Sequence, residues 1–376
     1  MTLTFFTNRL NHHQAPVADE LYRLLGDNFH FVETERPLEA ASKGSTEDFS
    51  KRSYLIKAWE NEAARKTADE KALSSDVAVF GAASIDYEVM RVRNTDKLTF
   101  DLSERWFKRG LLNAFSPHFV KHFWYYHTLF HRKPVYKLCA SAFAARDERR
   151  MLAFRNRCFK WGYFPRLAFP PVTDAAYSNP IRFMWCSRFV NWKHPELAIK
   201  LIKRLCVKGY RVSLDMYGDG PELAVSKELA SRLGMNDIIR FYGSQPNEVI
   251  LDEMRKHDVF LFTSDRMEGW GVVANEAISN GCVLVASDAI GSTPYLLRPR
   301  DTGIVYESGN LNSMEKEVEW LLDNPASYKL IRKNGLTYLS AYWSPAKAAE
   351  ALVRLSCELM ENLDNTTIKD GPCSKA

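Results

Sequence analysis

The sequence has few of the features that indicate a membrane span, a secreted protein or a disulfide framework. No uninterrupted apolar run approaches the roughly 18 residues that a helix needs to cross a bilayer. The N-terminal segment Met1–Asn11 lacks a basic stretch followed by a long apolar run, so it does not resemble a signal peptide. The seven cysteines are odd in number and form no C-x-x-C pair, which is typical of reduced thiols. We therefore expect a cytoplasmic protein.

Strong charge is also absent. The net charge is +5, with 46% hydrophobic and 26% charged residues, which is the composition of an ordinary soluble globular protein. So mild a positive charge does not indicate a protein that binds nucleic acid. The length of 376 residues suggests two domains, each large enough for its own core.

The sequence does not indicate a metal site either. His118 and His122, and then His127 and His131, are four residues apart, a spacing that can bind zinc. No Glu follows as in the H-E-x-x-H motif, no Cys lies close by, and no Asp-x-Asp pair ends a strand-like run. We therefore expect no metal and no cofactor.

Short apolar runs alternate with helical patterns along the whole chain. Strand-like runs occur at 3–7, 29–33, 77–80, 97–102, 135–140, 181–186, 212–217, 239–242, 259–262, 282–286 and 304–305. Helical patterns lie at 18–25, within 49–72, and at 195–205, 222–233, 248–256 and 272–278. Such alternation predicts parallel sheets with helices on both faces. The expected fold class is α/β, with two doubly wound, Rossmann-like domains that face each other across a cleft.

A proline-rich stretch separates the two halves and predicts an interdomain linker. Its members are Pro165, Pro170, Pro171 and Pro180. We therefore expect one domain over 1–172 and a second over 173–342. A C-terminal helix at about 343–361 is expected to pack back on the first domain, and the polar tail 362–376 is expected to be disordered.

Polar and glycine-rich motifs follow the predicted strands of the second half. In order, they are Cys186-Ser187-Arg188-Phe189 with Lys193, Tyr217-Gly218-Asp219-Gly220-Pro221, Phe241-Tyr242-Gly243, Thr263-Ser264, Glu268-Gly269-Trp270-Gly271, Asn275-Glu276-Ala277 and Ser287-Asp288. Because parallel strands end at the same edge of a sheet, these motifs are expected to meet there, where α/β folds bind ligands.

In that order and spacing, residues 180–340 resemble the retaining glycosyltransferases of family 4, which have the GT-B fold. The resemblance implies that the second domain binds a nucleoside diphosphate sugar, most often UDP-linked, and that the first domain faces the acceptor. It also implies transfer of a hexose to an acceptor hydroxyl with retention, without a required metal. The acceptor is expected to be a glycan or lipid-linked glycan of a cell-surface or capsular polysaccharide.

The resemblance gives the catalytic roles to Arg188, Lys193 and Glu268. Fixed cations stabilise a leaving diphosphate, since its negative charge grows as the glycosidic bond breaks. Arg suits bidentate phosphate contact, and Lys acts as a point charge. Glu268 is expected to contact the donor sugar. Taken alone, the Arg and the Lys could be ordinary surface residues near a loop.

The remaining donor contacts come from the same resemblance. Glu276 is expected to accept hydrogen bonds from the ribose hydroxyls, although alone it could be a solvated helix glutamate. The other expected contacts are the close backbone approach of Gly269 and Gly271, the aromatic Trp270, the N–H groups of Val272 and Val273, and Gly243 and Ser244 near the base.

The first half lacks the glycine-rich loop that the family commonly carries after its first strand. It has instead the polar segment Asn11, His12, His13 and Gln14. We expect this loop to face the acceptor or donor, although it could equally be a polar turn that caps a helix. Ser103, Glu104 and Ser141 also follow strand-like runs and are further acceptor-side candidates, because the family's usual histidine is missing here.

Residues 106–134 are basic and aromatic, with five Lys or Arg residues and no acid. The helical spacing of Phe119, Phe123, Tyr126 and Phe130 predicts that one face belongs to the core. The other face could rest on anionic lipid, or it could simply be solvated. A second basic cluster follows at Arg146, Arg149, Arg150, Arg155 and Arg157.

Two other functions remain open at this point. The same fold could carry out nucleotide-sugar epimerisation or phosphorolysis. The missing glycine-rich loop and histidine could also indicate a non-catalytic subunit that binds a nucleotide sugar.

Overall fold

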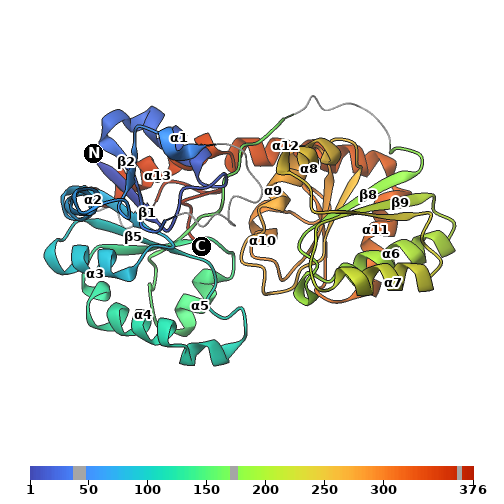
Figure 1. Cartoon of the computed structure of the whole chain (residues 1–376), viewed down its shortest axis with the longest axis horizontal. Coiled ribbons are helices and arrows are strands. Elements are labelled where there is room, and N and C mark those ends of the chain that lie inside the picture. The colour runs from blue at the N-terminus through green and yellow to red at the C-terminus, as the bar shows by residue number, and fades with distance from the viewer. Residues whose placement is uncertain (37–47, 170–176, 362–365) are drawn as a thin grey trace. The chain divides into compact units, whose positions relative to one another are not determined.

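The computed structural model describes residues 1–36, 48–169, 177–361 and 366–376, which form two compact units (Figure 1). The first unit ends at Arg166 and resumes at Tyr342, and the second begins at Leu167 and ends at Ala341. The domain boundary expected after residue 172, with Pro170 and Pro171, lies outside the described residues.

The first unit is built on a seven-stranded sheet in the order β3-β2-β1-β4-β5-β6-β7, and the strands pair in parallel. The strands are β1 (Leu3–Thr7), β2 (Phe29–Glu33), β3 (Leu55–Lys57), β4 (Val77–Phe80), β5 (Leu98–Ser103), β6 (Val135–Cys139) and β7 (Cys158–Lys160). The alternation of strands and helices therefore predicted the sheet correctly. The sequence did not predict β3 or β7, because three residues are too short to show a pattern.

Six α-helices belong to the first unit among the described residues. They are α1 (Ala15–Leu25), α2 (Glu62–Ser74), α3 (Ile85–Asn94), α4 (Pro117–Thr128), α5 (Ala144–Arg150) and α13 (Pro345–Met360). The start of α4 is well defined, since Pro117 occupies its first turn and the Ser116 hydroxyl accepts a hydrogen bond from the Phe119 N–H at 3.4 Å. Helix α13 returns from the end of the chain to contact α1.

The end of the chain corrects the expectation of a disordered tail, at least for residues 366–376. The backbone N–H of Cys373 donates to the carbonyl of Lys160 at 2.7 Å, and the N–H of Lys160 donates to the carbonyl of Ser374 at 2.8 Å. The Cys373 side chain is fully buried. The tail therefore covers the open edge of β7, and backbone pairing of this kind leaves no apolar pattern in the sequence.

A buried network of charges ties α4 and α5 to the first sheet. On β6, the Lys137 ammonium lies 2.9 Å from the Asp101 carboxylate of β5 and 3.2 Å from the Glu148 carboxylate of α5. On α4, His122 Nε2 lies 2.8 Å from the second Asp101 oxygen. Although burial opposes ionisation, Lys137 and His122 hold the pKa of Asp101 well below its usual range. The orientation of α4 about its axis is therefore fixed by a charged contact.

The second unit is built on a six-stranded parallel sheet in the order β10-β9-β8-β11-β12-β13. Its strands are β8 (Ile181–Cys186), β9 (Val212–Tyr217), β10 (Ile239–Gly243), β11 (Val259–Phe262), β12 (Val283–Ser287) and β13 (Ile304–Tyr306). Its helices are α6 (Pro195–Val207), α7 (Leu223–Arg232), α8 (Asn247–Met254), α9 (Val273–Ser279), α10 (Thr293–Leu296), α11 (Leu311–Asp323) and α12 (Pro325–Tyr342). Two doubly wound domains were expected from the sequence, and this is confirmed.

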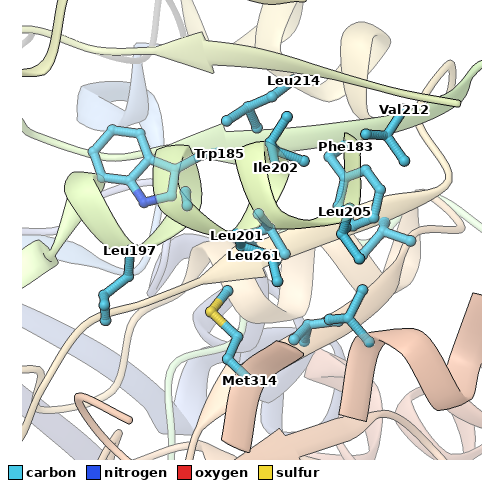
Figure 2. Packing of buried hydrophobic residues seen from close by; sticks show 14 of the residues in the cluster. Phe183, Trp185, Leu197, Leu201, Ile202, Leu205, Val212, Leu214, Leu261 and Met314 are labelled. Carbon is cyan, nitrogen blue, oxygen red and sulfur yellow. The ribbon is translucent and has the colours of Figure 1, made fainter. Parts of the chain in front are cut away.

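The core of the second unit lies between the sheet and helices α6 and α11 (Figure 2). Phe183 and Trp185 point from alternate positions of β8 toward Leu201 and Leu205 of α6. Met314 of α11 packs against the same cluster. Because this face of β8 and β11 is fixed by burial, the carboxyl ends of the two strands are held in register.

Candidate functional site

The candidate site lies where the strand order of the second sheet reverses. Strands β8 and β11 are neighbours at the centre of the sheet, with Val259 paired to Phe183 and Phe260 to Met184. The chain then winds outward through β9 and β10 on one side and through β12 and β13 on the other. Loops that leave adjacent strands toward opposite sides separate at this point, and doubly wound sheets bind ligands there.

An ion pair joins the loops that follow β8 and β11. The Lys193 ammonium bonds the Glu268 carboxylate, and the Ser264 hydroxyl donates to the same carboxylate at 3.0 Å. Both charged side chains are about nine-tenths buried, at 10% and 12% exposure. The structure thus brings together two of the three residues expected to be catalytic, which are 75 positions apart in the chain.

Lys193 is held in place by rings as well as by charge. Its Nζ atom lies 4.4 Å from the centre of the Trp192 ring and 5.9 Å from that of Phe262. Its backbone carbonyl accepts a hydrogen bond from the Thr263 hydroxyl at 2.6 Å. Burial lowers the pKa of Lys193, although the Glu268 carboxylate offsets part of that effect.

Arg188 supplies positive charge that is open to solvent. Its guanidinium carbon lies 5.9 Å from the centre of the Trp192 ring, to which the Lys193 ammonium is also close. Arg188 is exposed and, within the described residues, forms no ion pair. It is near enough to Lys193 to lower the pKa of that ammonium further. An exposed guanidinium beside a buried ammonium is an arrangement that attracts an anion.

Glu276 lies in α9, the helix that follows the Glu268 turn. Burial raises the pKa of this carboxyl to about 7, although the Asn247 amide at 3.4 Å partly opposes the shift. Burial, and then the charge of Glu276, raise the pKa of Cys186 to about 12, so Glu276 lies close to the end of β8. The structure therefore gathers Glu276 at the same place as Arg188 and Lys193.

The turn between Glu268 and α9 needs glycine. Gly271 has a φ of 80°, and a side chain there would place its Cβ 2.1 Å from the Phe262 ring and 3.2 Å from the Glu268 Cγ. The first turn of α9 leaves the N–H groups of Val272 and Val273 without helical carbonyl partners, as expected for a helix start. Gly269 is buried next to them.

The side chain of Trp270 packs inside the second unit. Its side chain is fully buried, its ring centre lies 6.0 Å from that of Tyr295, and its indole N–H donates to Asn275 Oδ1 at 2.9 Å. The ring of Trp270 thus belongs to the core of the second unit, and the expected contact of this residue with the donor stays a prediction.

The Gly218 and Gly243 loops meet behind the Arg188 loop. The Gly218 N–H donates to the Gly243 carbonyl at 2.7 Å. A side chain on Gly218 would collide with the Ser187 carbonyl at 1.8 Å, so the Gly-Asp-Gly loop is packed directly on the segment that carries Arg188. Ser244 is exposed at the rim, next to these loops.

Two residues that contact the site were not predicted from the sequence as functional. They are Trp192, whose ring lies beside Lys193, and Asn247, whose amide lies near Glu276. Ser264, which donates to Glu268, belongs to the Thr263-Ser264 motif that was expected at the end of β11. Trp192 precedes Lys193 in the chain, so its place in the same loop was a usable signal, whereas only the tertiary structure brings Asn247 to the site.

In the first unit, residues 11–14 form the turn that leads into α1. The Asn11 side chain accepts a hydrogen bond from the His13 N–H at 3.0 Å, and Gln14 precedes the helix without capping it through its side chain. The rings of His12 and His13 are 3.6 Å apart, and burial followed by the charge of His12 lowers the pKa of His13 to about 3. His13 is therefore neutral at physiological pH.

The other acceptor-side candidates lie at the ends of β5 and β6. The Ser103 hydroxyl bonds the Glu104 carbonyl at 3.1 Å, and the Glu104 carboxylate pairs with Lys108. Ser141 is fully buried, and its hydroxyl accepts a hydrogen bond from the Phe143 N–H at 3.3 Å. Ser141 therefore shapes the turn before α5 and is not open to a ligand.

A cavity of about 560 Å³ opens at the carboxyl edge of the first sheet, between α2 and α3. Its lining includes Trp59, Arg65, Asp69, Ser84, Asp86 and Tyr87. None of the acceptor-side residues expected from the sequence is among the described residues that line it. The cavity was not predicted from the sequence, because its wall combines residues that follow three different strands.

Three of the four paired histidines in and after α4 contact protein groups. His122 contacts Asp101, and His127 and His131 bond the carbonyls of Met151 and Tyr126. Across the described ranges, no three His, Cys, Asp or Glu side chains are grouped so that they could hold a metal ion.

In the same ranges, none of the helices has the length and apolar content to cross a bilayer.

Residues 174–337 match the family glycosyl transferases group 1. This segment contains all the charged residues gathered at the ends of β8 and β11. The similarity therefore applies to the second unit, and the match does not extend to the first.

Two curated relatives are similar over a comparable length. Protein CapJ of Staphylococcus aureus is 32% identical over 121 residues, which are 31% of this chain and 30% of that protein. The D-inositol 3-phosphate glycosyltransferase of Streptomyces bingchenggensis is 29% identical over 125 residues, 33% of this chain and 27% of that protein. The matched segments thus span less than a third of either relative.

Solved structures resemble the whole chain. A glycosyltransferase of Rickettsia africae aligns with a TM-score of 0.69 at 13% identity, over 96% of this chain and 99% of that one. Anabaena HepE, solved in complex with UDP, aligns with a TM-score of 0.69 at 13% identity, over 96% and 100%. At such identities the likeness shows the fold, and the expected GT-B class with two Rossmann-like domains is confirmed.

We expect Gly271→Ala to destabilise the second unit by more than about 2 kcal/mol, since it combines a left-handed backbone with an overlap against Phe262. Gly234→Ala is the matched control, because Gly234 has a φ of 69° and an added Cβ would meet nothing within 4 Å. That change should cost about 1 kcal/mol. Calorimetric unfolding of the full chain measures both, and equal losses would contradict the packing described for the turn.

Proposed function

We propose that this protein is a retaining glycosyltransferase that moves a hexose from a nucleoside diphosphate sugar to an acceptor hydroxyl. The observation that carries the proposal is the gathering of Arg188, Lys193, Glu268 and Glu276 around the ends of β8 and β11. A diphosphate donor needs fixed positive charge beside hydroxyl-binding carboxylates, and this place supplies both. The similarity of residues 174–337 to group 1 glycosyltransferases supports the same assignment.

In this mechanism, the cations act on the leaving group. As the glycosidic bond breaks, negative charge grows on the diphosphate, and Arg188 and Lys193 stabilise that charge in the transition state. Lys193 shares its ammonium protons between Glu268 and a phosphate oxygen, so the carboxylate keeps it oriented. The N–H groups of Val272 and Val273 add partial positive charge at the start of α9.

The two glutamates bind the neutral part of the donor. Glu276 accepts hydrogen bonds from the ribose hydroxyls, and Asn247 orients its carboxylate. Glu268 accepts a hydrogen bond from a hydroxyl of the sugar. It does so through the carboxylate oxygen that neither Lys193 nor Ser264 contacts. Gly269 and Gly271 allow the backbone to approach the sugar, and Gly243 and Ser244 flank the base.

The chemistry proceeds on one face of the sugar. The leaving phosphate oxygen takes the proton of the acceptor hydroxyl while that hydroxyl attacks the same face, so the anomeric configuration is kept and no covalent intermediate with the protein forms. No required metal enters this scheme, because Arg188 and Lys193 supply the charge. UDP is the proposed nucleotide, and the UDP complex of Anabaena HepE, which has a similar fold, supports this choice.

The cavity of the first unit is the proposed place for the acceptor. Trp59 offers an apolar ring, and Asp69, Asp86 and Ser84 offer hydrogen-bonding groups, which together suit a sugar with its apolar faces and hydroxyl edges. The acceptor is then a glycan, free or carried on a lipid, of a cell-surface or capsular polysaccharide. The protein acts in the cytoplasm, at the inner face of the membrane where a lipid-linked acceptor is presented.

The direct test is transfer activity with a panel of UDP-sugars and glycan acceptors, free and lipid-linked. Arg188→Ala and Glu276→Ala should each lower kcat/KM by roughly 100-fold or more, because each removes a contact to the donor. Arg232→Ala is the matched control, since Arg232 is an exposed arginine of the same unit and lies outside the site. The anomeric configuration of the product, read by NMR, should equal that of the donor.

Two outcomes would overturn the assignment. If both variants keep wild-type transfer, the site does not bind the donor. If the protein converts a UDP-sugar into another sugar nucleotide without any acceptor, it is an epimerase of the same fold.

Donor affinity should depend on pH through Glu276. Burial raises its pKa to about 7, so the carboxylate that binds ribose predominates only above that value. Between pH 8 and pH 6, the affinity for a UDP-sugar should therefore fall about tenfold as the carboxyl takes up its proton. Glu276→Gln keeps the shape without titrating, so its weaker affinity should be nearly independent of pH. Calorimetric titration measures both, and an unchanged pH dependence in the Gln variant would assign it to another group.

Trp59→Ala should raise the KM for the acceptor about tenfold and leave the dissociation constant of the donor unchanged, because the ring lines only the cavity of the first unit. Trp320→Ala is the matched control. Trp320 is also half-buried beneath an arginine, with the Arg300 guanidinium 4.2 Å from its ring centre, as Arg36 lies 5.4 Å from that of Trp59. Equal effects of the two variants on the acceptor KM would reject the cavity as the acceptor site.

A further inference from the structure

One region of the first unit exposes an unusual concentration of large apolar side chains. Within residues 111–124, the exposed ones are Leu111, Leu112, Phe115, Val120, Phe123 and Trp124, which we call the α4 apolar surface. Leu112 and Phe115 are 81% and 80% exposed, and Trp124 is 65% exposed. A soluble monomer seldom exposes so many neighbouring apolar side chains without a partner.

The exposure of these side chains does not result from loose packing of α4. The opposite face of α4 is buried, with Phe119 and Tyr126 in the core and His122 Nε2 2.8 Å from the Asp101 carboxylate. Turning the helix to bury Trp124 would pull His122 out of the buried charge network. The sequence predicted Phe123 as a core residue along with Phe119 and Tyr126, but its side chain is 42% exposed and belongs to the outer surface.

The neighbouring loop extends the same surface. The Tyr126 hydroxyl accepts a hydrogen bond from the Phe154 N–H at 2.6 Å, and His127 bonds the Met151 carbonyl at 3.0 Å, so the loop 151–154 lies against the end of α4. Leu152 in this loop has a φ of 57° and is 81% exposed. A branched residue seldom adopts such a backbone. Figure 1 shows α4 and α5 next to each other in this part of the unit.

The charge around the surface has one sign. Exposed basic side chains lie in the same segments of the chain and are called its basic rim, namely Arg109, Lys121, Arg146, Arg149, Arg150 and Arg155. Residues 106–134 contain no acid, and the two acids of α5, Asp147 and Glu148, are fully buried. The one nearby exposed carboxylate that pairs with these bases in the described chain is Asp86, 3.3 Å from Lys121.

We propose that the α4 apolar surface and its basic rim dock on a membrane that carries anionic lipids. Leucine, phenylalanine and tryptophan side chains enter the boundary between headgroups and acyl chains, and arginines bind lipid phosphates around them. A protein partner would need carboxylates opposite the arginines, whereas a lipid surface supplies the apolar layer and the negative charge together. Docking of this kind deepens the proposed function, because it brings the protein to the surface where a lipid-linked acceptor is presented. Only this reason for docking rests on the proposed function.

Binding is tested with the full chain and two kinds of vesicle, one of phosphatidylcholine and one of phosphatidylcholine mixed with phosphatidylglycerol, by flotation without donor or acceptor. The wild type should bind the mixed vesicles and lose that binding at high salt. Leu112→Ser with Phe115→Ser should weaken binding at least ~10-fold. The matched control is Val207→Ser with Leu330→Ser, which changes two exposed apolar residues of the second unit, 72% and 57% exposed, and should bind as the wild type does.

The basic rim is tested separately. Arg149→Gln with Arg150→Gln should weaken binding to the mixed vesicles by roughly 30-fold and leave any binding to neutral vesicles unchanged. Lys329→Gln with Lys333→Gln, two exposed lysines of α12, is the matched control and should have no effect.

The proposal is overturned if the wild type binds neither vesicle or if the control variants lose binding as the surface variants do. It is also overturned if the chain self-associates in sedimentation without binding vesicles and the Leu112 and Phe115 changes abolish that association, since the surface then joins two copies. Because vesicle binding is measured without transfer, its failure leaves the transferase assignment standing, and loss of transfer alone leaves the docking surface standing.

Discussion

The ion pair between Lys193 and Glu268 is the interaction on which the candidate site depends. It joins the loops that leave the two central strands of the second sheet, and it does so where both side chains are about nine-tenths buried. Removing one partner of a buried pair leaves an uncompensated charge, which costs about 3–5 kcal/mol. The second contact of Glu268, from Ser264, and the rings beside Lys193 give each charge further partners. The pair therefore holds the two loops at a fixed spacing, with the exposed charge of Arg188 beside them.

The sequence predicted those parts of the fold that depend on local patterns of apolar and polar residues. The continuous apolar run of β11 and the consecutive buried residues Phe183, Met184 and Trp185 of β8 are typical of strands covered on both faces, so the sequence predicted their position at the centre of a parallel sheet. The edge strands β3 and β7 were not readable, because three residues carry no period. The ordered end of the chain was missed for a related reason, since Cys373 and its neighbours are held by backbone hydrogen bonds to β7 that any polar sequence can make.

The site was predictable in so far as its residues follow strands. Arg188, Lys193, Glu268 and Glu276 each stand after a strand or in the first turns of a helix, so a parallel sheet must bring them to one edge. For Trp270, the motif gives the residue type and not the direction of the side chain, which packs against Asn275 and Tyr295 in the core. The acceptor-side candidates were chosen by the same strand-end rule, yet Ser141 is buried in a turn, and the cavity lies around Trp59 instead.

The two units use buried charge in different ways. In the second unit, the Lys193–Glu268 pair lies at the sheet edge, with exposed charge beside it that a ligand can reach. In the first unit, Lys137 pairs with Asp101 and with Glu148 of α5 in the interior of the protein. Because His122 anchors one face of α4 to this network, the opposite face of the helix points outward. An apolar outer face that is fixed in this way lowers solubility unless something covers it, so the buried charge network of the first unit explains why its apolar surface stays exposed.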